Sequence, residues 1–318
     1  MRSVLFSTKA FIGKIVTESF YKKLGKRLNA QIIISKGSVN IEWVKIDSGN
    51  KPTILFLHGF SDRKESFYFS AKSLYRNFDI IIPDLPGFGN STSDRSLIYS
   101  LDNYEIWLCE FIEQNNISRF HLVGNSLGGA IATKLAIKIP DKIKSLCLVD
   151  PAGFYLAGKR SVYDEALNAT NLFRVETPEE FDKFRDRVFH NRPRLPKFVK
   201  EFMISRAIQK KDWYRKIFNE LTNINLVKDG VKTVEELSLN SKCKEVQVPT
   251  NIFWGKQDTL FPYETADFLK KQMKAADVFI FQDTGHCPHL ENPKLFSKAL
   301  NDCLDKLEKT KGADPRIS

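Results

Sequence analysis

The stretch HLVGNSLGGA, His121–Ala130, decides the fold of this chain. It contains the pattern Gly-x-Ser-x-Gly, with Ser126 between Gly124 and Gly128, after the apolar run FHLV and before a helix-like segment. A strand that turns this sharply into a helix strains the backbone of the central serine, and bulky neighbours would clash there. The serine hydroxyl then lies exposed at the positive end of the helix. The pattern predicts that Ser126 is a catalytic nucleophile.

A base must take the proton of Ser126 before its hydroxyl can attack, and His286 is the strongest candidate. It follows Gly285, soon after the last predicted strand, DVFIF at 277–281, so it lies on a loop at the carboxyl edge of the sheet. His289 is the rival, three residues further on and at the start of the next predicted helix. The other histidines are His58, which is expected to brace its loop, His121 in a buried strand, and His190 in a helical insertion.

The base needs an acid that orients its ring, and two aspartates follow predicted strands. Asp258 in WGKQD comes after TNIFW, and Asp150 in LVDPAG ends SLCLV. Both fit the order nucleophile, acid, base along the chain, so the order does not separate them. The turn GKQD aims its carboxylate back toward the base, whereas Asp150 precedes a proline and suits a cap at the strand end. We therefore favour Asp258, which gives the predicted set Ser126, Asp258 and His286.

Cleavage of an acyl substrate creates an oxyanion that backbone N–H groups stabilise. The sequence predicts two such donors, the N–H of Leu127 directly after the nucleophile and the N–H of Phe60 in the loop LHGFSD. His286, Cys287 and His289 lie close together, but no carboxylate or further ligand has a spacing that suits zinc. We expect neither a metal nor an organic cofactor.

Short apolar runs alternate with helix-like stretches along most of the chain. QIIIS and NIEWVKI look like an opening hairpin, and the later runs are ILFL (54–57), DIII (79–82), FHLV (120–123), SLCLV (145–149), TNIFW (250–254) and DVFIF (277–281). Continuous apolar runs are typical of strands buried on both faces. Helical patterns lie between them, for example at 127–139 and 263–274. The alternation predicts an α/β fold, a mostly parallel sheet with helices on both faces.

The strand rhythm stops between about Pro151 and Pro249. Helix signals continue there, such as TPEEF, in which Thr177 is the expected N-cap and Glu180 reaches back in a capping box. We predict a helical cap inserted before the last two strands, over the strand carboxyl ends where such sheets bind ligands. The predicted organisation is a basic segment at 1–30, a core at 31–150 and 249–308, a cap at 151–248 and a tail at 309–318.

The composition of the 318 residues is ordinary for a globular protein, with 42% hydrophobic and 27% charged residues. The net charge of +11 raises nucleic acid and anionic membranes as partners. No nucleic-acid-binding module or stripe of arginines with stacking aromatics is present, so we expect no nucleic acid. The five cysteines are an odd number, widely spaced and without a CxxC pair, and are expected to be free core thiols in a reducing compartment.

Residues 1–30 contain one acid, Glu18, among seven lysines and arginines. Apolar residues recur every four positions, which predicts one apolar face of a helix. These residues are Ile12, Val16, Phe20, Leu24 and Leu28. Such a helix could lie on an anionic membrane surface or pack against the core, and the periodicity is the same for both.

Several stretches resemble the α/β-hydrolases with a cap domain: FLHGFSDRKESF, PDLPGFGNS, HLVGNSLGGAIA, SLCLVDPAG, WGKQD and TGHCPHLENP. Within that superfamily, LVDPAGF, TPEEF, WYRKIFNEL and WGKQD resemble the monoacylglycerol lipase branch of the α/β-hydrolase-domain proteins and related bacterial lipases. The resemblance covers roughly residues 37–307. It implies that Asp258 is the triad acid, and that the chain hydrolyses monoacylglycerol or similar lipid esters through an acyl-enzyme on Ser126. Members often carry an N-terminal membrane helix, whereas residues 1–30 here are too charged to span a membrane.

Other activities remain open beside ester hydrolysis. Relatives with the same Ser/His/Asp set cleave carbon–carbon bonds in ring-fission products, transfer acyl groups or cut peptides. A binding protein without catalysis is disfavoured because all three triad positions are filled. Ser126 argues against the enzymes that have an aspartate in the place of this serine. The expected partner is a small lipid ester. The expected location is the cytoplasm, with peripheral association at the inner face of a membrane as an open alternative.

Overall fold

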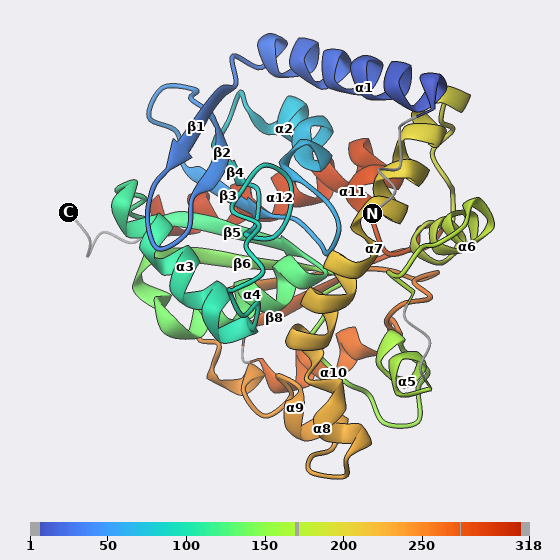
Figure 1. Ribbon diagram of the computed structural model, residues 1–318. Coiled ribbons are helices and arrows are strands. Elements are labelled where there is room, and N and C mark those ends of the chain that lie inside the picture. Colours follow the sequence, from blue (N-terminus) through green and yellow to red (C-terminus); the bar gives the residue numbers. More distant parts are fainter. Residues whose placement is uncertain (1–6, 169–171, 274, 313–318) are drawn as a thin grey trace.

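A central sheet of eight strands organises the protein, whose computed structural model describes residues 7–168, 172–273 and 275–312 (Figure 1). The strand order is β1-β2-β4-β3-β5-β6-β7-β8. The first two strands form the predicted antiparallel hairpin, β2 pairs antiparallel with β4, and the remaining pairs are parallel. The strands are β1 Gln31–Ser35, β2 Ile41–Ile46, β3 Thr53–Leu57, β4 Asp79–Pro83, β5 Phe120–Asn125, β6 Ile143–Val149, β7 Thr250–Gly255 and β8 Ala276–Phe281. The predicted α/β fold and the mostly parallel sheet are confirmed.

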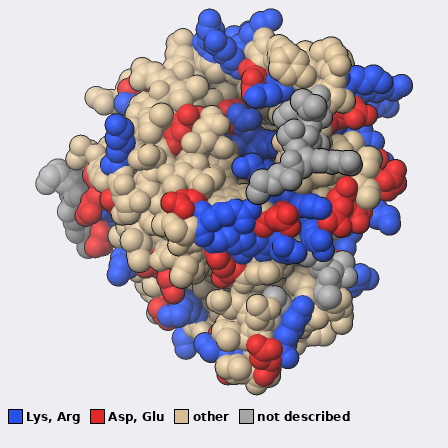
Figure 2. Space-filling model, in the orientation of Figure 1, with Lys and Arg blue, Asp and Glu red and all other residues tan. Residues whose placement is uncertain are grey.

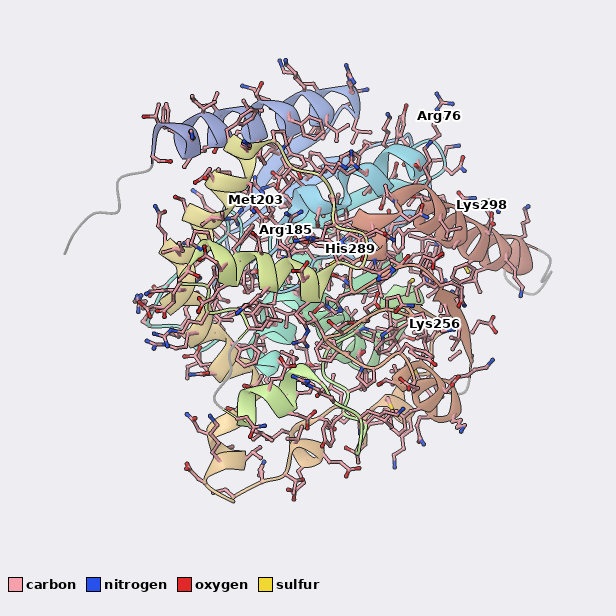
Figure 3. All side chains as sticks on the ribbon, turned by 90° about the vertical axis from the view of Figure 1, so that its right-hand side faces the viewer. Arg76, Arg185, Met203, Lys256, His289 and Lys298 are labelled. Carbon is pink, nitrogen blue, oxygen red and sulfur yellow. The ribbon has the colours of Figure 1, made fainter. Side chains whose placement is uncertain are left out.

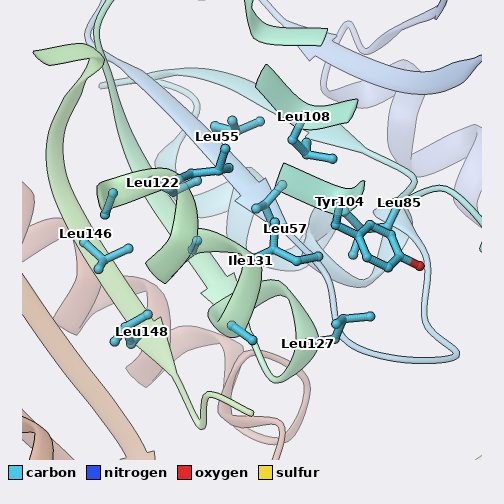
Figure 4. Packing of buried hydrophobic residues seen from close by; sticks show 14 of the residues in the cluster. Leu55, Leu57, Leu85, Tyr104, Leu108, Leu122, Leu127, Ile131, Leu146 and Leu148 are labelled. Atoms are coloured by element: carbon cyan, nitrogen blue, oxygen red, sulfur yellow. The ribbon is translucent and has the colours of Figure 1, made fainter. Parts of the chain in front are cut away.

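Helices cover both faces of the sheet, which explains the continuous apolar runs. Successive residues of a strand point to opposite faces. Leu55 and Leu57 of β3 therefore pack under one helical layer (Figure 4), and Ile54 and Phe56 pack under the other. The first layer contains α3 Leu101–Gln114, α4 Leu127–Lys138 and α10 Thr265–Gln272, and the second contains α2 Tyr68–Leu74 and α12 Pro293–Gly312. The short α11, Pro288–Glu291, precedes α12.

In the described part of the chain, five α-helices lie between β6 and β7 and form the predicted helical insertion, here called the cap. They are α5 Val162–Leu167, α6 Pro178–Val188, α7 Lys197–Thr222, α8 Ile224–Lys228 and α9 Val234–Leu237. At the start of α6 the hydroxyl of Thr177 accepts the predicted hydrogen bond from the N–H of Glu180. The return half of the capping box was wrong, because the Glu180 carboxylate accepts from the N–H of Glu176, one residue before the N-cap.

The N-terminal helix α1, Thr8–Arg27, packs against the first turns of α7 of the cap (Figures 1 and 3). Its inner face contains small residues, and a Cβ added at Gly13 would come 1.9 Å from the carbonyl oxygen of Phe198. The expected single apolar face was wrong. Leu24 and Leu28 are buried, but three of the predicted residues point to solvent because close helix contact needs small side chains on the inner face. The exposed fractions are 45% for Ile12, 39% for Val16 and 49% for Phe20.

Candidate active site

Ser126 occupies the sharp turn between β5 and α4, here called the elbow, with φ 53° and ψ −118°. The flanking glycines are required by close backbone contacts. A Cβ at Gly124 would come 2.2 Å from the carbonyl oxygen of Gly128, and a Cβ at Gly128 would come 2.2 Å from that of Leu57. Leu127 is the first residue of α4, so its N–H has no acceptor within the helix and is available to a ligand.

His286 lies beside Asp258, and their side chains are hydrogen-bonded, Nδ1 to Oδ2, at 2.7 Å. The other carboxylate oxygen of Asp258 accepts from the N–H groups of Leu260 at 2.7 Å and Phe261 at 3.2 Å. Because a carboxylate can only accept, the proton of the ring is on Nδ1. The buried Nε2 of His286 has no hydrogen-bond partner among the described residues, and its lone pair can take a proton.

Asp150, the other candidate acid, lies at the end of β6, whereas the ring of His286 is hydrogen-bonded to Asp258. The Oδ1 atom of Asp150 accepts a hydrogen bond from the N–H of Gly255 at 2.8 Å. Asp150, Asp258 and His286 nevertheless have donor atoms within 4.8 Å of one another, the one group of its kind that could hold a metal ion in the described part of the chain. In that group the Nδ1 of His286 is already bonded to the carboxylate, which leaves a hydrogen-bonded acid–base pair rather than an open ligand set.

His58 holds the loop that carries Phe60. Its Nε2 accepts from the backbone N–H of Leu85 at 2.9 Å, so Nδ1 carries the proton and donates to the carbonyl of Gly59 at 2.8 Å. That carbonyl belongs to the same peptide as the N–H of Phe60, and fixing one fixes the other. The loop lies against the elbow, since a Cβ at Gly59 would come 3.2 Å from the Cβ of Ser126.

A buried ion pair anchors the far end of this loop. Lys64 is fully buried, and its Nζ contacts Asp84 at 2.6 Å and Glu42 at 2.7 Å. Burial raises the pKa of Asp84, but the positive charge of Lys64 outweighs this effect and holds the pKa of that carboxyl below its usual value. The sequence did not indicate this contact, because a lysine in the polar stretch SDRKES looks like a solvated residue.

Two further contacts position the loop that carries His286, here called the histidine loop, and neither was predicted from the sequence. The side-chain amide of Asn125, beside Ser126, donates to the carbonyl of His286 at 3.2 Å. From the cap, the carbonyl of Val188 accepts from the N–H of His286 at 2.9 Å. Next to it, Arg187 bonds to Glu165 in the cap and to Thr259 beside Asp258.

An apolar pocket lies between the elbow and the cap, with Ser126 in its wall. Aromatic and aliphatic side chains dominate the lining, and none of the described residues that form it is charged. They include Phe60 from the core loop, Phe173, Phe218, Leu221, Val227 and Leu237 from the cap, and Phe261 from the loop after Asp258. Such a space suits an uncharged chain or ring.

The other histidines have structural surroundings. His289, labelled in Figure 3, is buried in α11 and stacks on Phe67 at 4.5 Å between ring centroids. Burial lowers the pKa of His289 to about 3, so its ring stays neutral. His121 bonds to Ser145 and Glu308. The five cysteines are free; three are buried, while Cys109 and Cys303 are half-buried. Burial raises the pKa of the Cys287 thiol, which disfavours the thiolate that a metal binds.

Comparisons with known proteins agree with this architecture. Residues 52–293 match the family described as alpha/beta hydrolase fold. Lipase 1 of Psychrobacter immobilis is 32% identical over 269 residues, which are 81% of each chain. Human monoacylglycerol lipase ABHD6 is 30% identical over 82% of this chain and 78% of its own. A solved structure described as a membrane phospholipase A, a bacterial virulence factor, superposes with a TM-score of 0.85 at 25% identity, covering 94% of this chain and 93% of that one. The chain therefore belongs to the α/β-hydrolase fold family and is related to bacterial lipases and to the ABHD6 monoacylglycerol lipases.

Proposed function

We propose that the protein is a serine hydrolase that cleaves neutral lipid esters, with monoacylglycerol as the best-fitting class. The observation that carries this proposal is the apolar pocket around Ser126, whose described lining residues carry no charge. An acyl chain gains roughly 0.8 kcal/mol for each CH₂ that leaves water, so such a pocket favours long acyl groups. The relationship to lipases supports the same reaction class.

The proposed reaction begins when Oγ of Ser126 attacks the ester carbonyl and Nε2 of His286 takes its proton. The oxyanion receives hydrogen bonds from the N–H groups of Phe60 and Leu127, and one such donor is typically worth about 10²–10³ in kcat. Collapse of the intermediate expels the alcohol, which takes the proton from His286. Water, activated by the same nitrogen, then hydrolyses the acyl-serine. Asp258 holds the ring and stabilises the imidazolium.

The uncharged pocket disfavours the alternative of carbon–carbon cleavage. A ring-fission dienoate carries a carboxylate, and burying an unpaired charge in an apolar site is costly. The described residues that line the pocket offer neither lysine nor arginine to pair with it.

The test compares hydrolysis of a monoacylglycerol and of a ring-fission dienoate by wild type, Ser126→Ala and the exposed control Ser96→Ala. We expect turnover of the glyceride alone, lost by several orders of magnitude in Ser126→Ala and kept in Ser96→Ala. Labelling by a fluorophosphonate should follow the same pattern. Faster turnover of the dienoate, or a folded Ser126→Ala with more than about a tenth of the activity, would contradict the proposal.

We also propose that the outer face of α1 docks on an anionic membrane that holds the substrate. This face consists of Phe11, Ile12, Ile15, Val16 and Phe20, whose exposed fractions range from 39% to 56%. Exposed lysines and an arginine follow in the last turns, and Figure 2 shows basic side chains beside uncharged surface along the edge where α1 lies. An apolar helix face with flanking basic residues suits the boundary between headgroups and acyl chains. No described helix is long and apolar enough to cross a bilayer.

Flotation with phosphatidylglycerol vesicles at low salt tests the docking. We expect wild type to float and Phe11→Ser/Ile15→Ser to stay behind, because each serine removes an apolar contact with the acyl region. Ile106→Ser is the matched control, since Ile106 is 57% exposed on α3. Equal flotation of all three proteins, or none by wild type, would show that the outer face of α1 is not the anchor.

A further inference from the structure

Asp150 is a buried carboxyl that the proposed reaction does not use. It ends β6 with a φ of 44°, a left-handed conformation that costs energy for a residue other than glycine. Oδ1 is occupied by the N–H of Gly255, whereas Oδ2 is buried and has no partner in the described part of the structure. A buried polar atom left unpaired typically costs about 1–3 kcal/mol, so its place beside the acid–base pair calls for an explanation.

The carboxylate of Asp258 has room for one more donor. It accepts from Leu260, Phe261 and His286, and a carboxylate offers about four acceptor sites. A carboxyl oxygen of Asp150, a carboxylate oxygen of Asp258 and a ring nitrogen of His286 all lie within 4.8 Å of one another. If Asp150 carried a proton on Oδ2, both the orphaned oxygen and the fourth acceptor site would be satisfied.

The surrounding charges favour that proton. Burial, and then the negative charge of Asp258, raise the pKa of Asp150 well above its usual range, and Glu291 of α11 acts in the same direction. The N–H of Gly255 opposes them. The carboxyl groups of Asp150, Asp258 and Glu291 also act on the thiol of Cys287, next to His286, as does that of Asp62. The neighbouring His289 is neutral. Two carboxylates this close do not both ionise readily without a cation between them.

We propose that Asp150 is protonated at neutral pH and donates this proton as a hydrogen bond to Asp258. Asp150 is then a positioning residue, which acts on the base through the acid. It keeps the second carboxyl uncharged, so that the imidazolium formed on His286 faces a single negative charge and can return its proton to the leaving alcohol. This inference rests on the proposed function for its kinetic consequence but not for the protonation state itself.

The first measurement is independent of activity. A protonated carboxyl has an infrared carbonyl stretch that a carboxylate lacks, and the difference spectrum of wild type and Asp150→Asn at pH 7 should contain it. Absence of this band overturns the proposal, whatever the enzyme hydrolyses. Presence of the band with no ester turnover by wild type would contradict the proposed function alone.

The second measurement is kinetic and compares Asp150→Asn with Asp150→Ala. The asparagine amide can donate to Asp258 and accept from Gly255, so we expect kcat within about tenfold of wild type, and the acid-side midpoint of kcat/KM should move by less than about one pH unit. Alanine removes the donor, and we expect a loss of about 10- to 100-fold in kcat with a smaller change in KM.

Two outcomes would overturn the positioning role. A midpoint that falls by more than about one unit in Asp150→Asn would show that a negative charge had been removed, since a neighbouring carboxylate favours the protonated imidazole. Equal losses of activity in the asparagine and alanine variants, matched by equal losses of stability, would show that Asp150 serves the fold alone.

Discussion

At the residue scale, replacement of Asp258 by asparagine should damage catalysis severely while leaving the fold intact. An amide can donate to Nδ1 of His286 and so hold the wrong tautomer, in which Nε2 carries the proton. The same change in a serine protease costs on the order of 10⁴ in kcat. Steady-state hydrolysis of a monoacylglycerol measures the effect, with Asp283→Asn, an exposed aspartate on the histidine loop, as the control. A loss below about tenfold would remove Asp258 from the proposed triad.

The elbow could be predicted from local residue patterns, but the contacts that align it could not. The glycines around Ser126 are read directly from a short stretch, because their cause is a backbone turn within that stretch. Asn125 and His286 are 161 positions apart, and no local pattern indicates that the amide of one holds the carbonyl of the other. The choice between Asp150 and Asp258 rested on the turn after β7, and in the structure it is Asp258 that hydrogen-bonds to His286.

At the element scale, the end of α6 should act as a brace for the loops that carry Asp258 and His286. Arg187 bonds to both carboxylate oxygens of Glu165 and also to Thr259, so it joins the cap to the loop of Asp258. Arg187→Ala should lower kcat by about 10- to 100-fold, because small displacements of reacting groups are costly. Arg187→Lys should recover part of this loss, since lysine keeps the charge but not the fork.

Arg192→Ala is the matched control for this brace, because Arg192 follows α6 and pairs with Asp186 at the surface. Stopped-flow acylation by a nitrophenyl ester separates the chemical step from product release. Equal rates for wild type and Arg187→Ala would mean that the cap does not position the loop.

Elements differ in how far the sequence specifies them. The strands of the core were predicted because burial on both faces leaves continuous apolar runs. The inner face of α1 was not predicted, because Ala10 and Gly13 are buried there and Gly13 contacts α7, while a search for hydrophobic periodicity passes over such small residues. Where a helix packs by close approach, its partner decides which side is buried.

At the scale of the whole molecule, the Lys64–Asp84 pair should govern how stability depends on pH. Removing one partner of a buried ion pair typically costs about 3–5 kcal/mol, so Lys64→Met should lower the denaturant midpoint clearly. Lys298→Met, which breaks a surface pair with Asp302, should change stability by less than about 1 kcal/mol.

The sign of the pH effect distinguishes this pair from general destabilisation. In wild type the depressed pKa of Asp84 contributes stability above the unfolded value of about 3.9, and this is lost as the pH falls through the folded value. Without Lys64 the buried carboxyl prefers its proton, so the variant should gain stability as the pH falls from 7 toward 5. A constant difference between the two proteins over this range would contradict the assignment.

The close packing of α1 on α7 has a kinetic consequence if the outer face of α1 lies in a bilayer. Gly13 leaves no space between the two helices, so the roof of the pocket and the membrane-bound helix move as one body, and the pocket keeps one orientation toward the lipid. The enzyme would then search in two dimensions. Its rate should follow the mole fraction of substrate in the membrane and fall when inert phospholipid dilutes that surface, even while the bulk substrate concentration stays fixed.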